Sequence, residues 1–268
     1  MEKNRQMNDW IVRYGFLLKK RNTDKQKDKF IQTFLSDVLN IRDDINVIEI
    51  EEKKRKYHNI YIGDVSKADK IITTYFDTPM VSFGDYSFTD TEKNKRNTLT
   101  RIAFESVASL CMGLGIFFFL MQVFEGTLLT TVLTVFALVF FYVFNRIVKG
   151  RACSNTQVRN TSSVIEVLSL LEKYKKNKKV AFAIVDGGCT NEIGLLALKN
   201  SVKSESKIYE LDSVGANTAL TVTKRSDPKS FKIHPDLKSL GNAILSEKID
   251  YELLIRQRQK IEILMEER

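Results

Sequence analysis

Hydrophobic and polar positions divide the chain into one long apolar block and two flanking segments of mixed pattern. Residues 107–124 and 127–144 are two uncharged apolar runs separated only by Glu125 and Gly126. Each run is about 18 residues long, and an α-helix needs roughly 17–25 apolar residues to cross the hydrocarbon core of a bilayer. The pattern therefore predicts two antiparallel membrane-spanning helices, whose outer ends lie on the same side of the membrane.

Basic residues flank this hairpin on both sides. Arg96 and Arg101 precede it, and Arg146 and Lys149 follow it. The positive-inside rule then places both flanks in the cytoplasm, which predicts a two-span protein of the cell membrane with cytoplasmic N- and C-terminal parts. The alternative is a buried core hairpin of a soluble protein. The nearly uniform apolar runs lack the polar stripe of a surface helix and favour the membrane.

Outside the apolar block, the spacing of apolar residues predicts helices and strands in a mixed order. Helical spacing covers residues 8–20 and 24–39, and strand-like alternation follows in 45–51, 58–65 and 69–77. After the block we expect a helix over 162–174, strands at 178–186, 207–215 and 219–224, and helices over 194–202 and 249–268. Alternation of strand and helix indicates an α/β sheet that is covered on both faces.

The domain organisation follows from this order. We expect an N-terminal helical segment over residues 1–44 and a transmembrane hairpin over residues 101–149. Residues 45–100 and 150–268 would form one α/β domain that the hairpin interrupts in sequence. No internal repeat is evident.

Charge and composition narrow the possible partners. Lys and Arg number 42 against 33 Asp and Glu, a net charge of +9. The basic residues are spread along the chain without the interleaved aromatics of a nucleic-acid module, so anionic membrane lipid is the expected partner and nucleic acid is not.

An odd count of three cysteines, with Cys111 inside the apolar block, argues against a disulfide framework. The abundance of Lys, Asn and Ile suggests an AT-rich bacterial genome.

Five segments in order resemble the di-zinc aminopeptidases. They are ADKIITTYFDTP, RNTSSVIEVLSLLEKY, VDGGCTNEIGLLALKNS, YELDSVGA and SEKIDYELL. The family is the co-catalytic zinc exopeptidases, which include bacterial leucyl aminopeptidases, glutaminyl cyclases and transferrin receptor ectodomains. The resemblance covers about residues 45–90 and 155–268, and it implies a three-layer α/β fold with a mixed sheet. The inserted hairpin is not part of the usual family pattern.

The family's chemistry requires five zinc ligands and a general base. A His, a bridging Asp, a Glu, an Asp and a final His hold two Zn²⁺ ions, and a Glu directly before the ligand Glu takes a proton from the attacking water. The resemblance places Tyr75 at the first His. It places Arg159, directly before Asn160, at the bridging Asp, and Asn191 at the general base.

Part of the pattern survives. The resemblance places Asp77 at the orienting Asp, Glu192 at the ligand Glu and Asp212 at the ligand Asp. The final His falls near Leu240, with His234 close by. A phenol, a guanidinium and an amide cannot hold two Zn²⁺ ions, and Arg is not deprotonated at working pH. We therefore expect no zinc, no other cofactor and no hydrolytic activity at this relic site.

The surviving carboxylates carry a further expectation. Asp77, Glu192 and Asp212 should converge, and the guanidinium of Arg159 would then replace the charge of the zinc ions, because unpaired buried charges are costly. The plainer alternative is that the three are caps or surface carboxylates at strand ends. Cys189 has no histidine nearby in sequence, so catalysis by its thiol is not expected. His234 is interpreted as a loop residue, or as a relic ligand.

These features favour a membrane-anchored, catalytically inactive peptidase-like protein. It would act on the cytoplasmic side as a binding or accessory subunit for a membrane protein, a peptide or a second copy of itself. One alternative is an active membrane-tethered metallopeptidase with a rearranged metal site made of Glu192, Asp212 and His234. Another is a structural subunit of a membrane transport complex. Because the hairpin is inserted at the carboxyl edge of the sheet, we expect this edge to face the bilayer.

Overall fold

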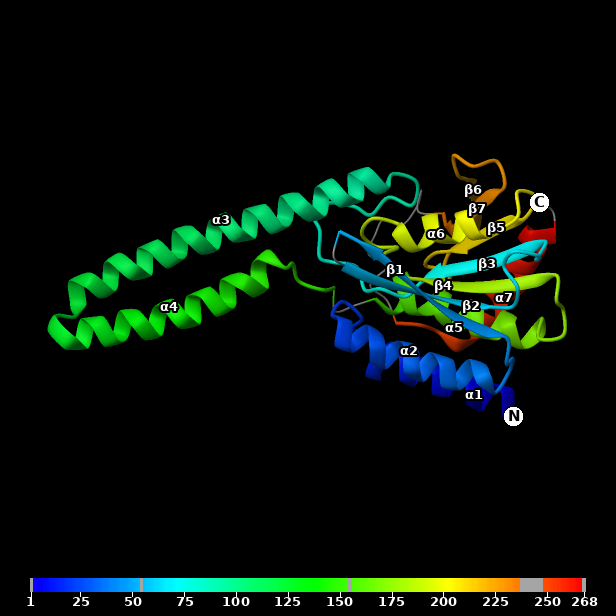
Figure 1. Ribbon diagram of the computed structural model, residues 1–268, viewed down its shortest axis with the longest axis horizontal. Coiled ribbons are helices and arrows are strands. Elements are labelled where there is room, and N and C mark those ends of the chain that lie inside the picture. The colour runs from blue at the N-terminus through cyan, green and yellow to red at the C-terminus, as the bar shows by residue number, and fades with distance from the viewer. Residues whose placement is uncertain (1, 54, 154–155, 237–247, 267–268) are drawn as a thin grey trace. The chain divides into compact units, whose positions relative to one another are not determined.

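The structure, a computed structural model, describes residues 2–53, 55–153, 156–236 and 248–266 (Figure 1). The chain forms two compact units. One unit comprises Met1–Pro79 and Cys153–Arg268 and carries the sheet, and the other is Met80–Ala152 and carries the two apolar helices.

The first unit is built on a seven-stranded mixed sheet in the order β1-β2-β4-β3-β5-β7-β6. Its strands are β1 Ile45–Glu52, β2 Arg55–Ile62, β3 Lys70–Tyr75, β4 Val180–Val185, β5 Lys207–Leu211, β6 Leu220–Lys224 and β7 Ser230–Pro235. The central strands β4, β3, β5 and β7 run parallel to one another, while β1, β2 and β6 pair antiparallel with their neighbours. The carboxyl ends of the four parallel strands therefore meet at one edge.

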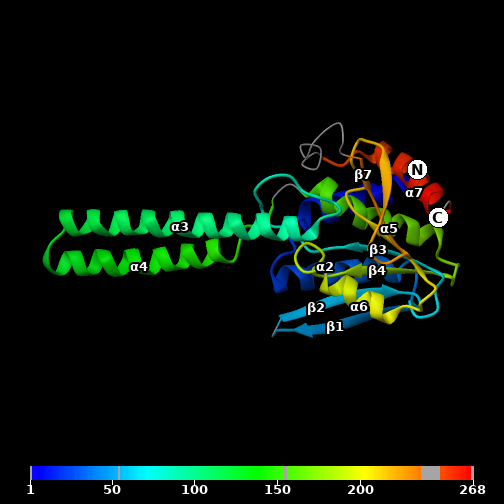
Figure 2. The same ribbon diagram turned by 90° about the horizontal axis from the view of Figure 1, so that it is seen from above.

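Helices cover both faces of this sheet. They are α1 Glu2–Val12, the π-helix η1 Arg13–Leu17, α2 Asp24–Leu39, the π-helix η2 Gln157–Thr161, α5 Ser162–Lys173, α6 Ile193–Ser201 and α7 Tyr251–Glu266. The larger apolar core lies between the sheet and α1, α2, α5 and α7, and a smaller core lies under α6. Figure 2 shows α5 and α6 on opposite faces. The predicted three-layer α/β fold with a mixed sheet is confirmed.

Strand β7 departs from the sequence expectation. Residues 230–235 were not predicted as a strand, and His234 was interpreted as a loop residue, but it lies within β7. The reason is that Lys232 and His234 alternate with apolar residues while the strand is buried on both faces. A buried strand with two basic positions does not have the continuous apolar run that parallel strands usually show.

The N-terminal segment is part of the main core. Thr23 and Gln26 form a capping box at the start of α2, in which each side chain caps the backbone of the other. Phe30 of α2 stacks on Phe76 after β3, with ring centroids 4.9 Å apart, and Tyr14 packs edge-on against Phe30 at 5.5 Å. This packing holds residues 21–27 against the carboxyl edge of the sheet.

The second unit is a helical hairpin of α3 Thr91–Val123 and α4 Gly126–Val148. The helices approach closely at Gly113, where an added Cβ would lie 2.4 Å from the ring of Phe140. Both are long and apolar enough to cross a membrane, and the most apolar 18-residue windows are only 6% and 0% buried. Leu138 is 70% exposed and Phe141 66%. Such exposure does not fit the alternative of a buried core hairpin.

Candidate functional site

The carboxyl edge of the sheet brings several of the expected residues together. Tyr75 ends β3, Asp212 directly follows β5, and Lys232 lies on β7, in register with Glu210 of β5. Side chains two positions apart on a strand share a face, so Glu210 and Asp212 point to the same side. The Tyr75 hydroxyl donates a hydrogen bond to Asp212 Oδ1 over 3.0 Å.

Asp212 is fully buried and faces a buried lysine. The Nζ of Lys232 lies 2.7 Å from Asp212 Oδ2 and 3.4 Å from Glu210 Oε1, and Lys232 is only 3% exposed. The Ser213 hydroxyl also donates to Asp212 Oδ1 over 2.8 Å. An unpaired buried charge costs several kcal/mol, roughly 3–5 when one partner of a buried pair is removed. Lys232 thus neutralises a carboxylate that could not otherwise be buried in ionised form.

Arg225 extends this network to Glu192. Its guanidinium contacts both carboxylate oxygens of Glu192 at 3.2 Å and also forms an ion pair with Glu210. Burial lowers the pKa of Arg225, but Glu210 and Glu192 outweigh it and raise the pKa overall. Glu192 is the N-cap of α6 with a φ of +54°, a left-handed conformation that is uncommon outside glycine. This backbone conformation fixes the direction in which the Glu192 side chain leaves the turn.

A second charged group surrounds Asp77. The Nζ of Lys27 lies 2.7 and 2.9 Å from the two carboxylate oxygens of the fully buried Asp186. Asp77 Oδ2 accepts the backbone N–H of Cys189 over 3.1 Å. Burial, and then the neighbouring Asp186, raises the pKa of Asp77 to about 6. Burial and then Asp77 also raise the pKa of the Cys189 thiol, so little of the nucleophilic thiolate forms at neutral pH.

Arg21 reaches the same place from the N-terminal segment. It is fully buried, and its Nη2 donates to Asn160 Oδ1 and, over 3.0 Å, to Thr161 Oγ1. Asn160 in turn donates to the backbone carbonyls of Tyr75 (3.0 Å) and Asp77 (3.2 Å). Burial lowers the pKa of Arg21 to about 10, so the guanidinium still carries its charge at neutral pH.

Arg159 and Asn191 also lie at this edge. The Arg159 carbonyl oxygen lies 3.4 Å from the Tyr75 hydroxyl and 3.1 Å from the Ser213 hydroxyl, the two groups that donate to Asp212. The Arg159 guanidinium is near enough to Cys189 to oppose the rise in the thiol pKa that burial and Asp77 cause. Asn191 Nδ2 donates to the Tyr57 hydroxyl over 2.9 Å. That Arg159 replaces the charge of a metal remains a prediction.

The donors at this edge do not fit a two-zinc centre. Among the residues that the structure describes, no group of three or more His, Cys, Asp or Glu side chains is placed to hold a metal ion. Asp212 faces the Lys232 ammonium, and Glu192 is held by Arg225. A Zn²⁺ ion would have to displace these cations, because zinc ligands must present free lone pairs.

The remaining positions of the resemblance are His234, on the same strand as Lys232, and Leu240. His234 Nε2 lies 2.8 Å from Thr223 Oγ1 on β6, and its Nδ1 lies 2.9 Å from the carbonyl of Pro235. Burial lowers the pKa of His234, which favours its neutral form. Leu240 falls outside the described part of the chain.

Four basic residues of the site were missed from sequence: Arg21, Lys27, Arg225 and Lys232. A signal for one of them exists. Glu210 in β5 and Asp212 directly after it alternate with apolar residues, and Lys232 and His234 do so in β7. Charges two apart in otherwise apolar strands lie on one buried face, where opposite charges must meet. Nothing comparable marks Arg21 or Lys27, which sit in a basic stretch.

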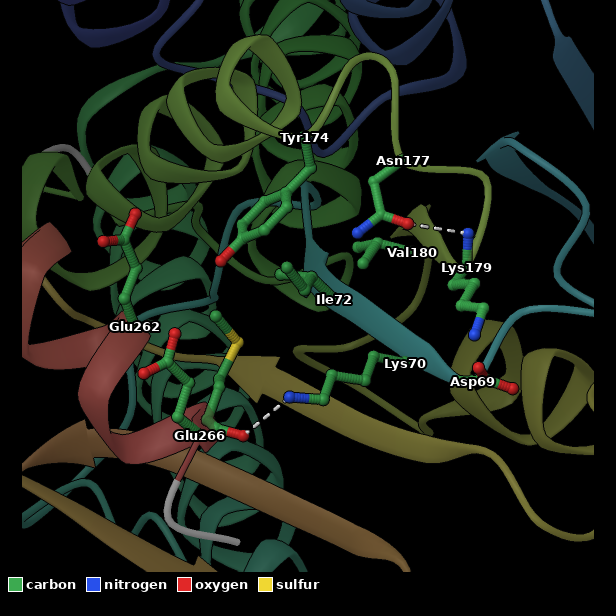
Figure 3. Close-up of a pocket in the computed structure, with 10 residues that line it drawn as sticks. Asp69, Lys70, Ile72, Tyr174, Asn177, Lys179, Val180, Glu262 and Glu266 are labelled. Atoms are coloured by element: carbon green, nitrogen blue, oxygen red, sulfur yellow. Dashed lines mark hydrogen bonds between the residues drawn. The ribbon is translucent and has the colours of Figure 1, made fainter.

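The pocket shown in Figure 3 lies at the other end of the strands. Lys70 and Val180, the first residues of β3 and β4, line it, together with Tyr174, Glu262 and Glu266. Ligands of open α/β sheets bind at the carboxyl ends of strands, so this position does not fit the usual site.

Comparison with solved structures identifies the fold. Glutaminyl cyclase from Porphyromonas gingivalis matches with a TM-score of 0.57 and 9% identity, covering 99% of this chain and 98% of that one. A Zn-dependent exopeptidase from Parabacteroides distasonis matches with a TM-score of 0.54 and 10% identity, covering 97% and 95%. The fold is that of the zinc exopeptidases. No protein-family model and no curated protein matches the sequence.

Proposed function

We propose that this chain is a membrane-anchored, catalytically inactive member of the zinc-exopeptidase fold that serves as a binding or accessory subunit. The observation that carries the proposal is the Lys232 ammonium at 2.7 Å from Asp212 Oδ2, within a buried carboxylate network. Asp212 stands where the resemblance places a zinc ligand. A basic side chain there supplies the positive charge that a metal would supply, without an open position for a water nucleophile.

The membrane part of the proposal is supported by the hairpin. Two helices of membrane-spanning length have almost no buried residues in their most apolar windows, and lipid is the environment in which such exposed apolar side chains are stable. Arg96 and Arg101 before the spans, and Arg146 and Lys149 after them, favour a cytoplasmic position for both flanks. The sheet-carrying unit would then work at the inner surface of the cell membrane.

The binding role is supported by the retained architecture of the sheet edge. Replacement of buried ion pairs by apolar residues is often neutral or stabilising, so stability alone does not require these pairs. Their presence in an inactive chain would therefore indicate that the shape of the edge still has a role. Here Lys232, Arg225 and Arg21 hold the edge in a defined shape. The proposed partner is a peptide or a membrane protein that is recognised and left uncut.

Metal analysis of the purified chain, combined with assays, tests the proposal. We expect zinc well below one ion per chain, with no release of amino-terminal residues and no cyclisation of amino-terminal glutamine. Stoichiometric zinc that a chelator removes together with activity would instead support the alternative of an active metallopeptidase.

Crosslinking in membranes before detergent extraction, followed by identification of the products, tests the accessory role. Recovery of only the uncrosslinked chain would argue against it.

A further inference from the structure

A small surface of the sheet-carrying unit combines apolar and basic side chains. In η1 and the residue before it, Leu17 is 74% exposed, Val12 51% and Phe16 49%. Lys19 and Lys20 follow directly and are also exposed. Apolar side chains beside lysines are the pattern of surfaces that rest in the interface of an anionic bilayer.

Hydrogen bonds connect the backbone of residues 15–21 to the two places where the chain leaves this unit, after Pro79, and returns to it, at Cys153. Thr78 exchanges hydrogen bonds with residues 19–21, since its Oγ1 accepts the Arg21 N–H over 2.7 Å and its own N–H reaches the Arg21 carbonyl over 3.2 Å. The N–H of Cys153 donates to the Pro79 carbonyl over 2.9 Å. Gln157 Nε2 donates to the Gly15 carbonyl over 3.4 Å.

The length of the second connection limits the distance to the membrane. Helix α4 ends at Val148, with Arg146 in its last turn, and Cys153 comes five residues later. Five fully extended residues span at most about 18 Å. If α4 crosses the bilayer, Arg146 lies at the headgroups, and Cys153 lies within about 18 Å of the end of α4. A membrane-spanning α4 would therefore tether Cys153, and through the hydrogen bonds of Pro79 and Thr78 also the backbone of Arg21, within a short reach of the lipid surface.

We infer that Val12, Phe16, Leu17, Lys19 and Lys20 form a lipid-docking surface. The apolar side chains would enter the headgroup region, and the two lysines would meet anionic headgroups, which attract basic side chains close to the surface. The inference rests on the proposed membrane anchoring of the hairpin. It adds a second, peripheral contact that holds the sheet-carrying unit against the membrane.

Fluorescence quenching in lipid nanodiscs tests this docking surface. Trp10, the chain's single tryptophan, is 4% exposed and stays in every variant as a constant background. Leu17→Trp reports on the surface, and Leu196→Trp on α6, where Leu196 is 55% exposed, is the matched control. Leu138→Trp on α4 reports on the hairpin. The discs contain one quarter phosphatidylglycerol, with phosphatidylcholine brominated near the headgroup for positions 17 and 196 and near the chain ends for position 138, which lies in the middle of α4.

We expect bromolipid to quench the tryptophan at position 17 about two-fold more than the one at position 196, as an interfacial side chain requires. Lys19→Glu with Lys20→Glu, or omission of phosphatidylglycerol, should lower the quenching at position 17 and leave position 138 unchanged. Equal quenching at positions 17 and 196, with position 138 quenched, would overturn the docking surface alone. An unquenched position 138 would overturn the membrane anchoring and the docking surface with it.

Discussion

The sheet-carrying unit and the hairpin unit place charge and apolar surface in opposite ways. At the carboxyl edge of the sheet, Asp212 and Asp186 are fully buried, and each faces a lysine. In the hairpin, apolar residues such as Leu138 and Phe141 are two-thirds or more exposed. In a typical soluble enzyme, by contrast, charged side chains line an open cleft and apolar side chains are buried.

The difference shows where each unit obtains its stabilisation. Buried carboxylates need partners inside the protein, and Lys232, Lys27 and Arg225 provide them. Exposed apolar helices need partners outside it, and a bilayer provides those. Under the proposed function, buried ion pairs stand in place of a metal at the edge of the first unit, and lipid covers the apolar helices of the second.

The largest effect is expected from Lys232→Met. The substitution leaves Asp212 and Glu210 without their shared ammonium, which should lower the free energy of unfolding by roughly 3–5 kcal/mol. Lys203→Met is the matched control, because Lys203 pairs with Asp69 at the surface and such pairs contribute about 0–1 kcal/mol. Urea unfolding in detergent measures both. Similar midpoints for the two variants would show that Lys232 does not hold the edge.

The next effect concerns the hairpin. Leu138→Arg places a charge in the middle of α4, which should cost about 2.5–3.5 kcal/mol of membrane insertion. When membranes are washed with alkaline buffer, we expect a larger share of this variant than of the wild type to be released into the soluble fraction. Leu196→Arg, at a position on α6 that is 55% exposed, should leave the distribution unchanged. Retention of Leu138→Arg in the membrane fraction at wild-type levels would argue against spanning by α4.

A smaller effect is expected from the pH dependence of Glu166. This fully buried residue of α5 bonds Arg258 over 3.0 Å, and burial raises its pKa to about 7 despite the guanidinium. A raised carboxyl pKa means that the folded state favours the protonated form. Stability should therefore fall as the pH rises from about 4.5 to about 7 and level off above, by roughly 1–3 kcal/mol.

Glu166→Gln removes this titration. Its unfolding free energy should vary less between pH 5 and 8 than that of the wild type, as linkage requires. Glu205→Gln, an exposed position, serves as control and should keep the wild-type profile. If the unfolding free energies of the wild type and of Glu166→Gln changed with pH by the same amount, Glu166 would not be the cause of the pH dependence.

Much of the fold could be predicted from the pattern of apolar positions, and part of the site could not. Helix α2 and the strands around Tyr75 and Asp212 follow from local spacing. Strand β7 was missed because Lys232 and His234 interrupt its apolar run, although their alternation marks a buried face. The pairing of Lys27 with Asp186 spans 159 positions, so only the folded chain reveals it.

Zinc titration followed by thermal unfolding tests the central claim most directly. A metal that binds only the folded chain stabilises it, by about 2.7 kcal/mol at a hundred times its dissociation constant. With Lys232 on Asp212, we predict that added zinc leaves the unfolding temperature of the full chain unchanged, as does a chelator. A rise of several degrees with zinc that Asp212→Asn abolishes would show that this edge still binds a metal, and would contradict the account.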